Sequence, residues 1–388
     1  MPKSELTKAI IDATREALNA EGPVPLHVPF LNGSEARCLG EAVESTFVSS
    51  VGPFVDRFEA ELGSLTGARR VVATSSGTSA LQLALRVAGV RRGDEVLVPS
   101  LTFVATANAV SYLGAFPHFV DVEETTLGID PKALRRWLVF ASEMTDEGLR
   151  NKTTGRMIRA LVPMHTFGHP SRIESLCEVA REFSLVVVED AAESLGSTYK
   201  EKHTGTFGLL GAVSFNGNKI VTTGGGGAIL TDDDALADRA KHLSTTAKKA
   251  HSWEYIHDEI GYNFRMPNIN AALGVAQLGQ LPDFLSSKRA LADKYRAAFD
   301  GIDAVSIVTE PTHSRSNYWL QTLRLKEGGA PYLDEILEGL NAAGFGARPV
   351  WRPLHTLEIY ETASRAPLPV TEKLGRALIN LPSSAGLA

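Results

Sequence analysis

Two short stretches of the chain hold residues whose types and spacing could do chemistry. Residues 186–192 form an apolar run that ends in two carboxylates, Glu189 and Asp190. Residues 214–219 end in Lys219, which is followed after four residues by the glycines 224–227. An acid at the end of a buried strand and a lysine in a crowded turn suit pyridoxal phosphate (PLP). The acid keeps the pyridine nitrogen of PLP protonated, and the lysine forms the Schiff base.

Each of these two residues also has a plain structural interpretation. Asp190 could cap a helix or lie in a solvated turn, and a single lysine most often serves as a surface charge. Position favours a functional Asp190, because ligands bind outside the carboxyl ends of the strands in open parallel sheets. Lys219 lies between an apolar strand and the glycines, a partly desolvated setting that favours a neutral, nucleophilic amine. We expect it to act afterwards as the base and acid of a proton shift.

Groups that could bind a phosphate occur in the same regions. Gly77, Thr78 and Ser79 open a helix directly after a strand, and N–H groups and hydroxyls at a helix N-terminus form an anion site. The alternative is a simple helix cap. Ser214 could supply a further hydroxyl. The glycines 224–227 are not followed by the Gly-Lys-Ser/Thr of a Walker motif, so we expect a tight turn beside the lysine.

An aromatic residue and three histidines complete the candidates. Phe103 follows a strand end, where an aromatic side chain could cover one face of a PLP ring. His165 and His169 have the i, i+4 spacing of a helical metal pair, but the neighbouring glycine and proline argue against a helix, and we expect no metal site. His165 and His355 are candidate substrate contacts, and either could equally be structural.

These side chains need a framework of strands that alternate with helices. Unbroken apolar strands separated by helices predict an α/β fold with a mostly parallel central sheet and helices on both faces. The strands expected in this sheet are 69–74, 95–99, 116–122, 158–163, 185–189, 212–215 and 228–231. The helices expected around it are 4–19, 34–46, 54–66, 80–88, 102–113, one that begins at Pro131, 171–183 capped by Ser171, and one capped by Asp232 that ends near Leu243.

The remaining segments have other patterns. Residues 141–155 and 245–266 are expected to be loops. A long helical region with a break at Pro282 is expected over 268–299, followed by strands at 305–308 and 318–325 and a helix at 331–343. We therefore predict a large PLP-binding domain with an N-terminal helical arm over 1–250. Residues 251–388 would then hold an interface loop, long helices and a smaller C-terminal α+β domain.

Properties of the whole chain narrow the classes of function. The 388 residues are 44% hydrophobic and 22% charged with a net charge of −6, and no basic run suggests nucleic-acid binding. Cys38 and Cys177 lie far apart and fit a reducing compartment. The N-terminus lacks the apolar core of a signal peptide, and no window approaches the about 20 apolar residues of a membrane span. We expect a cytoplasmic protein that binds neither nucleic acid nor membranes.

Six motifs in a fixed order carry a resemblance to a known family. They are Ser75-Ser-Gly-Thr-Ser-Ala-Leu, Pro99-Ser-Leu-Thr-Phe, Glu189-Asp-Ala-Ala-Glu-Ser-Leu-Gly, Ser214-Phe-Asn-Gly-Asn-Lys, Thr223-Gly-Gly-Gly-Gly and Gly261-Tyr-Asn-Phe-Arg-Met-Pro. Each motif alone is loose, but all six in register are specific, and the similarity spans about Val28 to Ser384. The chain resembles the DegT/DnrJ/EryC1/StrS family of PLP-dependent nucleotide-sugar aminotransferases.

The resemblance implies a fold-type I aminotransferase that works as a homodimer with active sites at the subunit interface. By matching position, Lys219 is the Schiff-base lysine, Asp190 is the partner of the ring nitrogen, and Phe103 is the stacking residue. The hydroxyl groups implied at the cofactor phosphate are those of Thr78, Ser79 and Ser214.

Two further positions follow from the same resemblance. Asn263 would reach the phosphate of the cofactor held by the other subunit. Glu193 occupies a position near the 3-oxygen of the ring where the family usually has Gln or His, which is a change in charge. The family also usually continues past Leu381-Pro-Ser-Ser with a final helix, so we expect that helix either to be missing or to be cut off in this sequence.

The resemblance also implies a substrate class. The wording of residues 162–170 and an insertion-like stretch at 140–157 are most similar to the branch that aminates 4-keto-6-deoxy-N-acetylhexosamine nucleotides for bacterial surface sugars. The implied reaction takes the amino group of L-glutamate onto PLP, which becomes its amino form, PMP. The amino group then passes to a nucleotide-linked keto-deoxysugar, expected to be 4-keto-6-deoxy and UDP-linked.

The sequence disfavours three alternatives to this reaction. A PLP/PMP-dependent sugar dehydratase of the same fold would have histidine in place of the lysine, so Lys219 argues against it. A catalytically idle regulatory or binding protein of this fold would be expected to lose Lys219 or Asp190, or to carry a DNA-binding extension. A nicotinamide-dependent dehydrogenase would need an early Gly-x-Gly-x-x-Gly fingerprint, which the sequence lacks.

Overall fold

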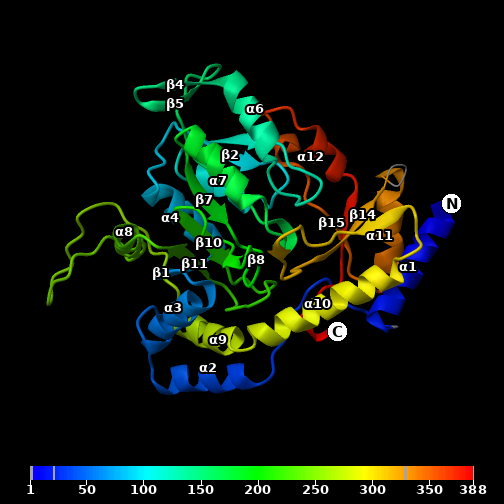
Figure 1. Ribbon diagram of the computed structural model, residues 1–388. Coiled ribbons are helices and arrows are strands. Elements are labelled where there is room, and N and C mark those ends of the chain that lie inside the picture. The colour runs from blue at the N-terminus through cyan, green and yellow to red at the C-terminus, as the bar shows by residue number, and fades with distance from the viewer. Residues whose placement is uncertain (1–2, 21, 327–329, 388) are drawn as a thin grey trace.

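A seven-stranded sheet forms the centre of the protein (Figure 1). The computed structural model describes residues 3–20, 22–326 and 330–387. The strand order is β1-β11-β10-β7-β6-β2-β3. The bounds are β1 (Arg70–Thr74), β2 (Glu95–Pro99), β3 (Phe116–Val120), β6 (Ile158–Leu161), β7 (Val186–Asp190), β10 (Leu210–Ser214) and β11 (Gly227–Thr231). The pairs from β10 to β3 are parallel, and β11 is antiparallel to both neighbours. The predicted mostly parallel sheet is thereby confirmed.

Helices cover both faces of this sheet because successive side chains of a strand point to opposite sides. Val72 and Ala212 share a core with side chains of α4 and α8. Ala73 and Val213, the next residues along the same strands, share another core with α3 and α9. The helices around the sheet are α2 (Ser34–Glu44), α3 (Pro53–Thr66), α4 (Gly77–Val87), α5 (Ala105–Ser111), α6 (Pro131–Ala141), α7 (Ile173–Glu182), α8 (Asp234–Ser244) and α9 (Asn268–Leu278).

A second, antiparallel sheet lies in the C-terminal part, in the order β12-β14-β16-β15. Its strands are β12 (Val305–Ile307), β14 (Gln321–Leu325), β15 (Arg348–Pro349) and β16 (Leu378–Leu381). The helices packed on it are α1 (Lys3–Leu18), α10 (Leu281–Ala298) and α11 (Leu333–Ala342). Leu6 and Ile10 of α1 share a core with Tyr295 and Leu340, so the N-terminal helix packs on C-terminal elements (Figure 1). The division of the chain at residue 250 stays a prediction.

The predicted loop over residues 141–155 is wrong. The chain there forms an antiparallel hairpin of β4 (Ser142–Thr145) and β5 (Gly148–Asn151). Its strands are short, with Leu149 as the one buried apolar side chain, and the opposed exposed side chains of Glu143 and Arg150 form an ion pair of 2.7 Å. A charge pair across two strands stabilises a hairpin but leaves no apolar alternation to read in the sequence.

Several short elements were not predicted. Three strands form a small sheet: β8 (Thr198–Tyr199), β9 (Lys202–His203) and β13 (Ser314–Arg315). The others are α12 (Pro369–Leu374) and the 3-10 helices η1 (Thr166–Gly168), η2 (Ala330–Tyr332), η3 (Leu354–Thr356), η4 (Glu358–Tyr360) and η5 (Ala385–Leu387).

Local hydrogen bonds explain two errors in the predicted helix starts. Ser171 does not cap α7, which begins at Ile173, because the backbone N–H and hydroxyl of Ser171 face the ring of His165. The cap of α8 is Asp233, one residue after the predicted Asp232, and it accepts a hydrogen bond from the backbone of Leu236.

Some predicted elements were too long. α5 covers seven residues of the predicted 102–113, and β3 ends at Val120. The strand predicted over 318–325 begins only at Gln321. The helical region 268–299 does divide as predicted, since Pro282 lies in the first turn of α10, where proline is tolerated.

Residues 245–266 form the predicted loop, and part of it projects far from the body of the protein near α8 (Figure 1). Trp253, Tyr255 and Ile260 in this loop are 79%, 80% and 92% exposed. His242 of α8 contacts Asp258 at 2.7 Å, which ties the loop to the helix. Among the helices that the structure describes, none combines the length and the apolar character needed to cross a bilayer.

Candidate active site

Strand β7 delivers Asp190 to the edge where the carboxyl ends of the parallel strands meet. The side chain is buried, and its Oδ2 accepts a 2.7 Å hydrogen bond from Oγ1 of Thr106. Its Oδ1 accepts a hydrogen bond of 3.2 Å from the backbone of Ala192. Burial raises the pKa of Asp190, against the effect of these hydrogen bonds and of the charge on Lys219. A cation placed against this carboxylate would offset the cost of burying it.

Glu189, the residue before Asp190, anchors the loop between β9 and β10. Its buried carboxylate accepts hydrogen bonds from the backbone N–H groups of Gly205 (2.8 Å), Phe207 (2.6 Å) and Gly208 (2.7 Å). Burial acts to raise the pKa of Glu189, but hydrogen bonds from His165 and the backbone outweigh it, and the pKa is lowered. The strand that carries Asp190 is therefore fixed from its opposite face.

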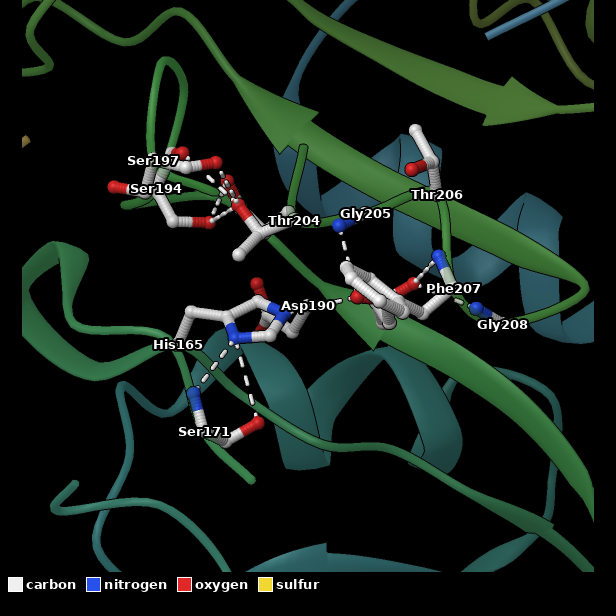
Figure 2. A network of polar contacts seen from close by, with 12 residues as sticks. His165, Ser171, Asp190, Ser194, Ser197, Thr204, Gly205, Thr206, Phe207 and Gly208 are labelled. Atoms are coloured by element: carbon white, nitrogen blue, oxygen red, sulfur yellow. Dashed lines mark hydrogen bonds and ion pairs between the residues drawn. The ribbon is translucent and has the colours of Figure 1, made fainter. Parts of the chain in front are cut away.

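The structure places neither of the candidate substrate histidines in the active-site cavity. Figure 2 shows His165 beside Ser171. Nε2 of His165 lies 3.0 Å from the carboxylate of Glu189. His355 Nδ1 lies 2.8 Å from the hydroxyl of Ser100, in the buried part of the fold. Both rings are held by protein groups, which is the structural interpretation that the sequence left open.

Lys219 lies in the turn between β10 and β11. Its backbone N–H donates a 2.9 Å hydrogen bond to the carbonyl of Asn216. Its Nζ lies 3.4 Å from Oε1 of Glu193 and 3.9 Å from the centre of a Trp319 ring. The side chain of Lys219 is 13% exposed. The amine is therefore held between a carboxylate and an aromatic face, in a mostly desolvated setting.

The close packing predicted for the glycines 224–227 is found at Gly226 and Gly227, whereas a Cβ on Gly225 would meet nothing within 4 Å. Gly224 has a φ of +76°, which favours glycine. A Cβ on Gly227 would lie 2.4 Å from the backbone of Ser76, so a side chain there would push β11 away from the start of α4. The run therefore brings the turn of Lys219 close to the helix N-terminus.

The N-terminus of α4 forms one wall of the site. Ser76 and Ser79 make a capping box, in which each hydroxyl accepts a hydrogen bond from the backbone of the other, at 3.1 and 3.0 Å. A Cβ on Gly77 would lie 2.6 Å from Cβ of Ser214, so only glycine allows this approach of helix to strand. The helix end and the hydroxyls of Thr78 and Ser214 suit a phosphate. The structure places the hydroxyl of Ser79 in the cap and not in the cavity lining.

A cavity of about 350 Å³ joins these groups, a volume within the range of small-molecule sites. The predicted site residues that line it are Gly77, Thr78, Phe103, Asp190, Glu193, Ser214 and Lys219. Asn263 does not line it. Asn263 is exposed at the base of the loop 245–266, where it is bridged to Thr245 and its Oδ1 accepts a hydrogen bond of 3.1 Å from Arg265. Its predicted role toward a second subunit stays a prediction.

Sequence reasoning missed several residues of the cavity. They are Ser76, Leu81, Ala105, Thr106, Met164, Ala192, Asn216, Asn218, Gly225, Gly226, Trp319 and Trp351. Thr106 could have been found, since it lies one helical turn after Phe103 and faces the same way. Trp319 and Trp351 come from the C-terminal part of the chain, and no local pattern indicates that they reach β7.

The residues present fit PLP, on three observations of this site. A buried carboxylate of raised pKa faces the cavity, an amine lies across from it, and the start of α4 forms a cradle that a Cβ would fill. When bound, PLP supplies an electron-poor ring that accepts the electron pair left when a proton leaves the amine-bearing carbon. Asp190 would hold the ring nitrogen, the start of α4 and Ser214 the phosphate, and Lys219 the aldehyde end. The fold and site define a PLP-dependent enzyme of the aminotransferase class.

Comparison with known proteins gives the family. The chain belongs to the DegT/DnrJ/EryC1/StrS aminotransferase family, whose model matches residues 31–388. GDP-perosamine synthase of Escherichia coli O157:H7 is 37% identical over 365 residues, which cover 94% of each chain. EpsN of Bacillus subtilis (strain 168) is 38% identical over 338 residues, 87% of this chain and 84% of EpsN.

Solved structures agree over almost the whole chain. The aminotransferase TlmJ from Streptoalloteichus hindustanus superposes with a TM-score of 0.85 at 28% identity over 94% of each chain. Helicobacter pylori PseC, an aminotransferase involved in the biosynthesis of pseudoaminic acid, gives 0.85 at 26% identity over 94% of this chain and 95% of PseC. The predictions of the fold-type I architecture, of a PLP-dependent sugar aminotransferase and of PLP/PMP as cofactor are thereby confirmed.

Proposed function

We propose that this enzyme moves the amino group of L-glutamate to a nucleotide-linked 4-keto-6-deoxysugar that enters a bacterial surface polysaccharide. The observation that carries the reaction type is that Lys219 and Asp190 line one cavity beside the N-terminus of α4. Relatives support the sugar: three proteins named GDP-perosamine synthase are 33–37% identical over 94% of this chain. The spore coat polysaccharide biosynthesis protein SpsC of Bacillus subtilis (strain 168) is 32% identical over 87% of it.

The chain's own residues divide the work in this proposal. Asp190, oriented by Thr106, keeps the ring nitrogen protonated and so makes the ring a better electron acceptor. Lys219 Nζ takes the proton from the α-carbon of glutamate, which gives up its amino group. In the second half of the reaction it donates a proton to the sugar carbon that gains the amino group. The indole rings of Trp319 and Trp351 line the cavity and limit the access of water to the reacting groups.

The nucleotide has two candidates. The sequence resemblance indicates a UDP-linked sugar. The relatives named GDP-perosamine synthase favour a GDP-linked sugar, and they are similar to this chain over nearly its full length. We therefore place a GDP-linked 4-keto-6-deoxysugar beside the UDP-linked one as the second substrate to be tested.

A panel of nucleotide sugars tests the substrate. Purified enzyme with PLP and L-glutamate is incubated separately with UDP-, GDP- and dTDP-linked 4-keto-6-deoxysugars and with 3-keto sugars, and products are measured by mass spectrometry. Exchange of the keto oxygen for an amino group on a 4-keto sugar, with 2-oxoglutarate formed in equal amount, is expected. Amination of 3-keto sugars alone would overturn the proposed position. Loss of oxygen from the sugar without gain of nitrogen would instead indicate the dehydratase. Lys219→Ala is the inactive control.

We further propose a cytoplasmic homodimer in which the loop 245–266 contacts a second copy and Asn263 reaches that copy's cofactor phosphate. The loop projects from the body and exposes Trp253, Tyr255 and Ile260, which a partner surface would cover (Figure 1). Asn263 lies outside its own cavity. Two free cysteines, Cys38 and Cys177, are consistent with a reducing compartment.

Mixed dimers test the shared site. Lys219→Ala and Asn263→Ala are each expected to lower activity as homodimers, the second through weaker PLP retention. When the two variants are unfolded and refolded together, a shared site predicts partial recovery, because one of the two sites in each mixed dimer is then intact. Recovery would be absent if Asn263 served its own chain, and a monomeric mass in light scattering would exclude the dimer.

A further inference from the structure

Glu193 has a place in the site that its predicted contact with the ring does not explain. It lies three residues after Asp190 and is 3% exposed. Its two carboxylate oxygens have different neighbours. Oε2 accepts a 2.9 Å hydrogen bond from the backbone N–H of Phe167, whereas Oε1 lies 3.4 Å from Nζ of Lys219. One oxygen is therefore fixed by the fold, and the other faces the reactive amine.

The backbone of Phe167, which donates this hydrogen bond, is strained. Phe167 has a φ of +56°, in the left-handed region that bulky residues rarely adopt. Its ring packs against Trp351 with centroids 4.9 Å apart, so the side chain is held as well. Strained residues of this kind persist where the surrounding structure determines them, often at functional sites. Here the strained backbone aims an N–H at Glu193.

Asn317 connects Glu193 to Trp319, the aromatic residue against Lys219. Its Nδ2 donates a 2.9 Å hydrogen bond to the carbonyl of Glu193, and its Oδ1 accepts one of 2.8 Å from the backbone N–H of Trp319. The indole N–H of Trp319 donates a 2.8 Å hydrogen bond to the carbonyl of Asn218, the residue before Lys219. The carboxylate, the indole and the lysine turn are therefore held as one unit.

The pKa of Glu193 suits proton exchange. Burial raises the pKa of Glu193 to about 7, against the opposing effects of the charge on Lys219 and the N–H of Phe167. Asp190 adds to the rise in pKa as a second nearby carboxylate. A carboxyl group with a pKa near neutrality exchanges protons most effectively at neutral pH.

We propose that Glu193 exchanges a proton directly with Nζ of Lys219. In one direction an N–H bond of the Lys219 ammonium breaks and an O–H bond forms on Oε1 of Glu193. The electron pair stays on nitrogen, and the net charge of the pair stays zero. Glu193 thereby stores the proton that Lys219 must lose before it attacks a carbonyl carbon. An amide or imidazole side chain at this position would not provide a carboxylate. The proposal rests on PLP chemistry and not on the sugar proposed above.

The alternative is that Glu193 only anchors the loop at Phe167. Glu193→Gln separates the two roles, because an amide oxygen still accepts the hydrogen bond from Phe167 but carries no charge toward Lys219. Glu193→Asp keeps the charge on a shorter side chain. Glu178→Gln, an exposed change on α7, is the matched control.

The test is a pH titration of the absorption spectrum of the PLP-loaded protein, which requires no sugar. Loss of the carboxylate removes a negative charge near the bound amine, so in Glu193→Gln the midpoint of the spectral change is expected to fall by about 1 to 3 pH units. Glu193→Asp should lie closer to the wild type, and Glu178→Gln should coincide with it. An unchanged midpoint in a Glu193→Gln protein that binds PLP would overturn the proposal.

A second measurement can be made even if the Glu193→Gln protein retains PLP too weakly for the titration. The rate at which cofactor-free protein captures added PLP depends on the fraction of Lys219 that is neutral. In Glu193→Gln the pH at which this rate is half-maximal is expected to fall by a similar amount. A capture profile identical to that of the wild type would contradict the proposal even where the spectrum cannot be titrated. A failed sugar assay would leave both measurements unaffected.

Discussion

Oγ1 of Thr106 donates a hydrogen bond of 2.7 Å to Oδ2 of Asp190, and both groups are buried. The contact joins the first turn of α5 to the end of β7 and leaves Asp190 one orientation in the cavity. Thr106 Oγ1 also lies 2.8 Å from the hydroxyl of Thr102, so the donor is itself positioned. The orientation of Asp190 therefore depends on side chains of a separate segment, residues 102–106.

Thr106→Val keeps the shape of the side chain and removes the donor. A hydrogen bond to a charged group contributes about 1.5–3 kcal/mol, so we expect kcat to fall by about 10- to 100-fold. PLP content should be retained, because Lys219 and the start of α4 are unchanged. Steady-state kinetics and the absorption of bound PLP check both parts. Ser111→Ala, at the other end of α5, serves as the control, and an equal loss in that variant would contradict the specific role of Thr106.

Gly77→Ala tests the close approach of α4 to β10. The added Cβ would lie 2.6 Å from Cβ and 2.9 Å from Oγ of Ser214, so the helix start must move away from the strand. Overpacking of this kind costs about 1–3 kcal/mol, and we expect PLP affinity to fall by about tenfold or more. Fluorescence titration of the cofactor-free protein with PLP measures the change.

Gly40→Ala is the matched control for this substitution. Gly40 lies inside α2, and a Cβ there would meet nothing within 4 Å. Alanine inside a helix is favoured over glycine by about 0.5–1 kcal/mol, so this variant should keep PLP affinity and gain some stability. Equal PLP affinity in both variants would show that the cradle at Gly77 does not hold the phosphate.

The groups predicted from sequence are those that occur in continuous motifs. Asp190 ends an apolar strand, and Lys219 precedes a glycine run, so each has a local signal. Ser79 was assigned to the phosphate although its hydroxyl is used in the capping box. The sequence pattern alone does not separate a helix cap from an anion site, because both need a hydroxyl at the same place.

The part of the site that sequence could not predict comes from contacts between distant segments. Trp319 and Lys219 are far apart in the sequence. They meet only because the seven-stranded and four-stranded sheets pack together. The buried positions of His165 and His355 depend on Glu189 and Ser100, partners that only the fold brings within reach. The central sheet itself was predictable, because strands buried on both faces have unbroken apolar sequences.

The buried amine of Lys288 should make the stability of the protein depend on pH in the neutral to alkaline range. Its buried Nζ lies 3.0 Å from the carbonyl of Trp319 and 3.1 Å from Nε2 of His27. Burial lowers the pKa of Lys288 to about 7 from the ordinary value of 10.5. Between these values the unfolded chain binds more protons than the folded protein, so this group makes stability rise with pH. Below pH 7 both states are protonated, so stability no longer changes with pH through this group, and the cost of burying the ammonium is at its full value.

Lys288→Met removes this dependence. We expect the unfolding free energy of the wild type minus that of the variant to grow by up to about 4 kcal/mol from pH 7 to 10.5. Urea denaturation followed by circular dichroism at several pH values measures it. Lys294→Met, on the exposed side of the same helix, should show a constant difference. A constant difference for Lys288→Met as well would mean that the amine stays charged in the folded protein.

Glu95 gives a dependence of stability on pH with the same sign, but at acid pH. It is fully buried at the start of β2, where it is hydrogen-bonded to His118 Nδ1 at 2.7 Å, Asn151 Nδ2 at 2.8 Å and Thr154 Oγ1 at 2.7 Å. Burial acts to raise the pKa of Glu95, but these hydrogen bonds outweigh it and lower the pKa to about 2 from 4.5. The folded state therefore favours the ionised carboxylate, which stabilises the fold above pH 4.5 and loses this effect as the pH falls to about 2.

Glu95→Gln removes the charge and leaves the volume unchanged. We expect the variant to be less stable than the wild type by roughly 2–4 kcal/mol at pH 7, and this difference to shrink steadily below pH 4.5. Urea denaturation from pH 7 to pH 3 measures the two curves. Glu143→Gln in the exposed hairpin should lose little at any pH, since exposed ion pairs contribute at most about 1 kcal/mol. A difference that stays constant down to pH 3 would show that Glu95 is held by packing and not by its charge.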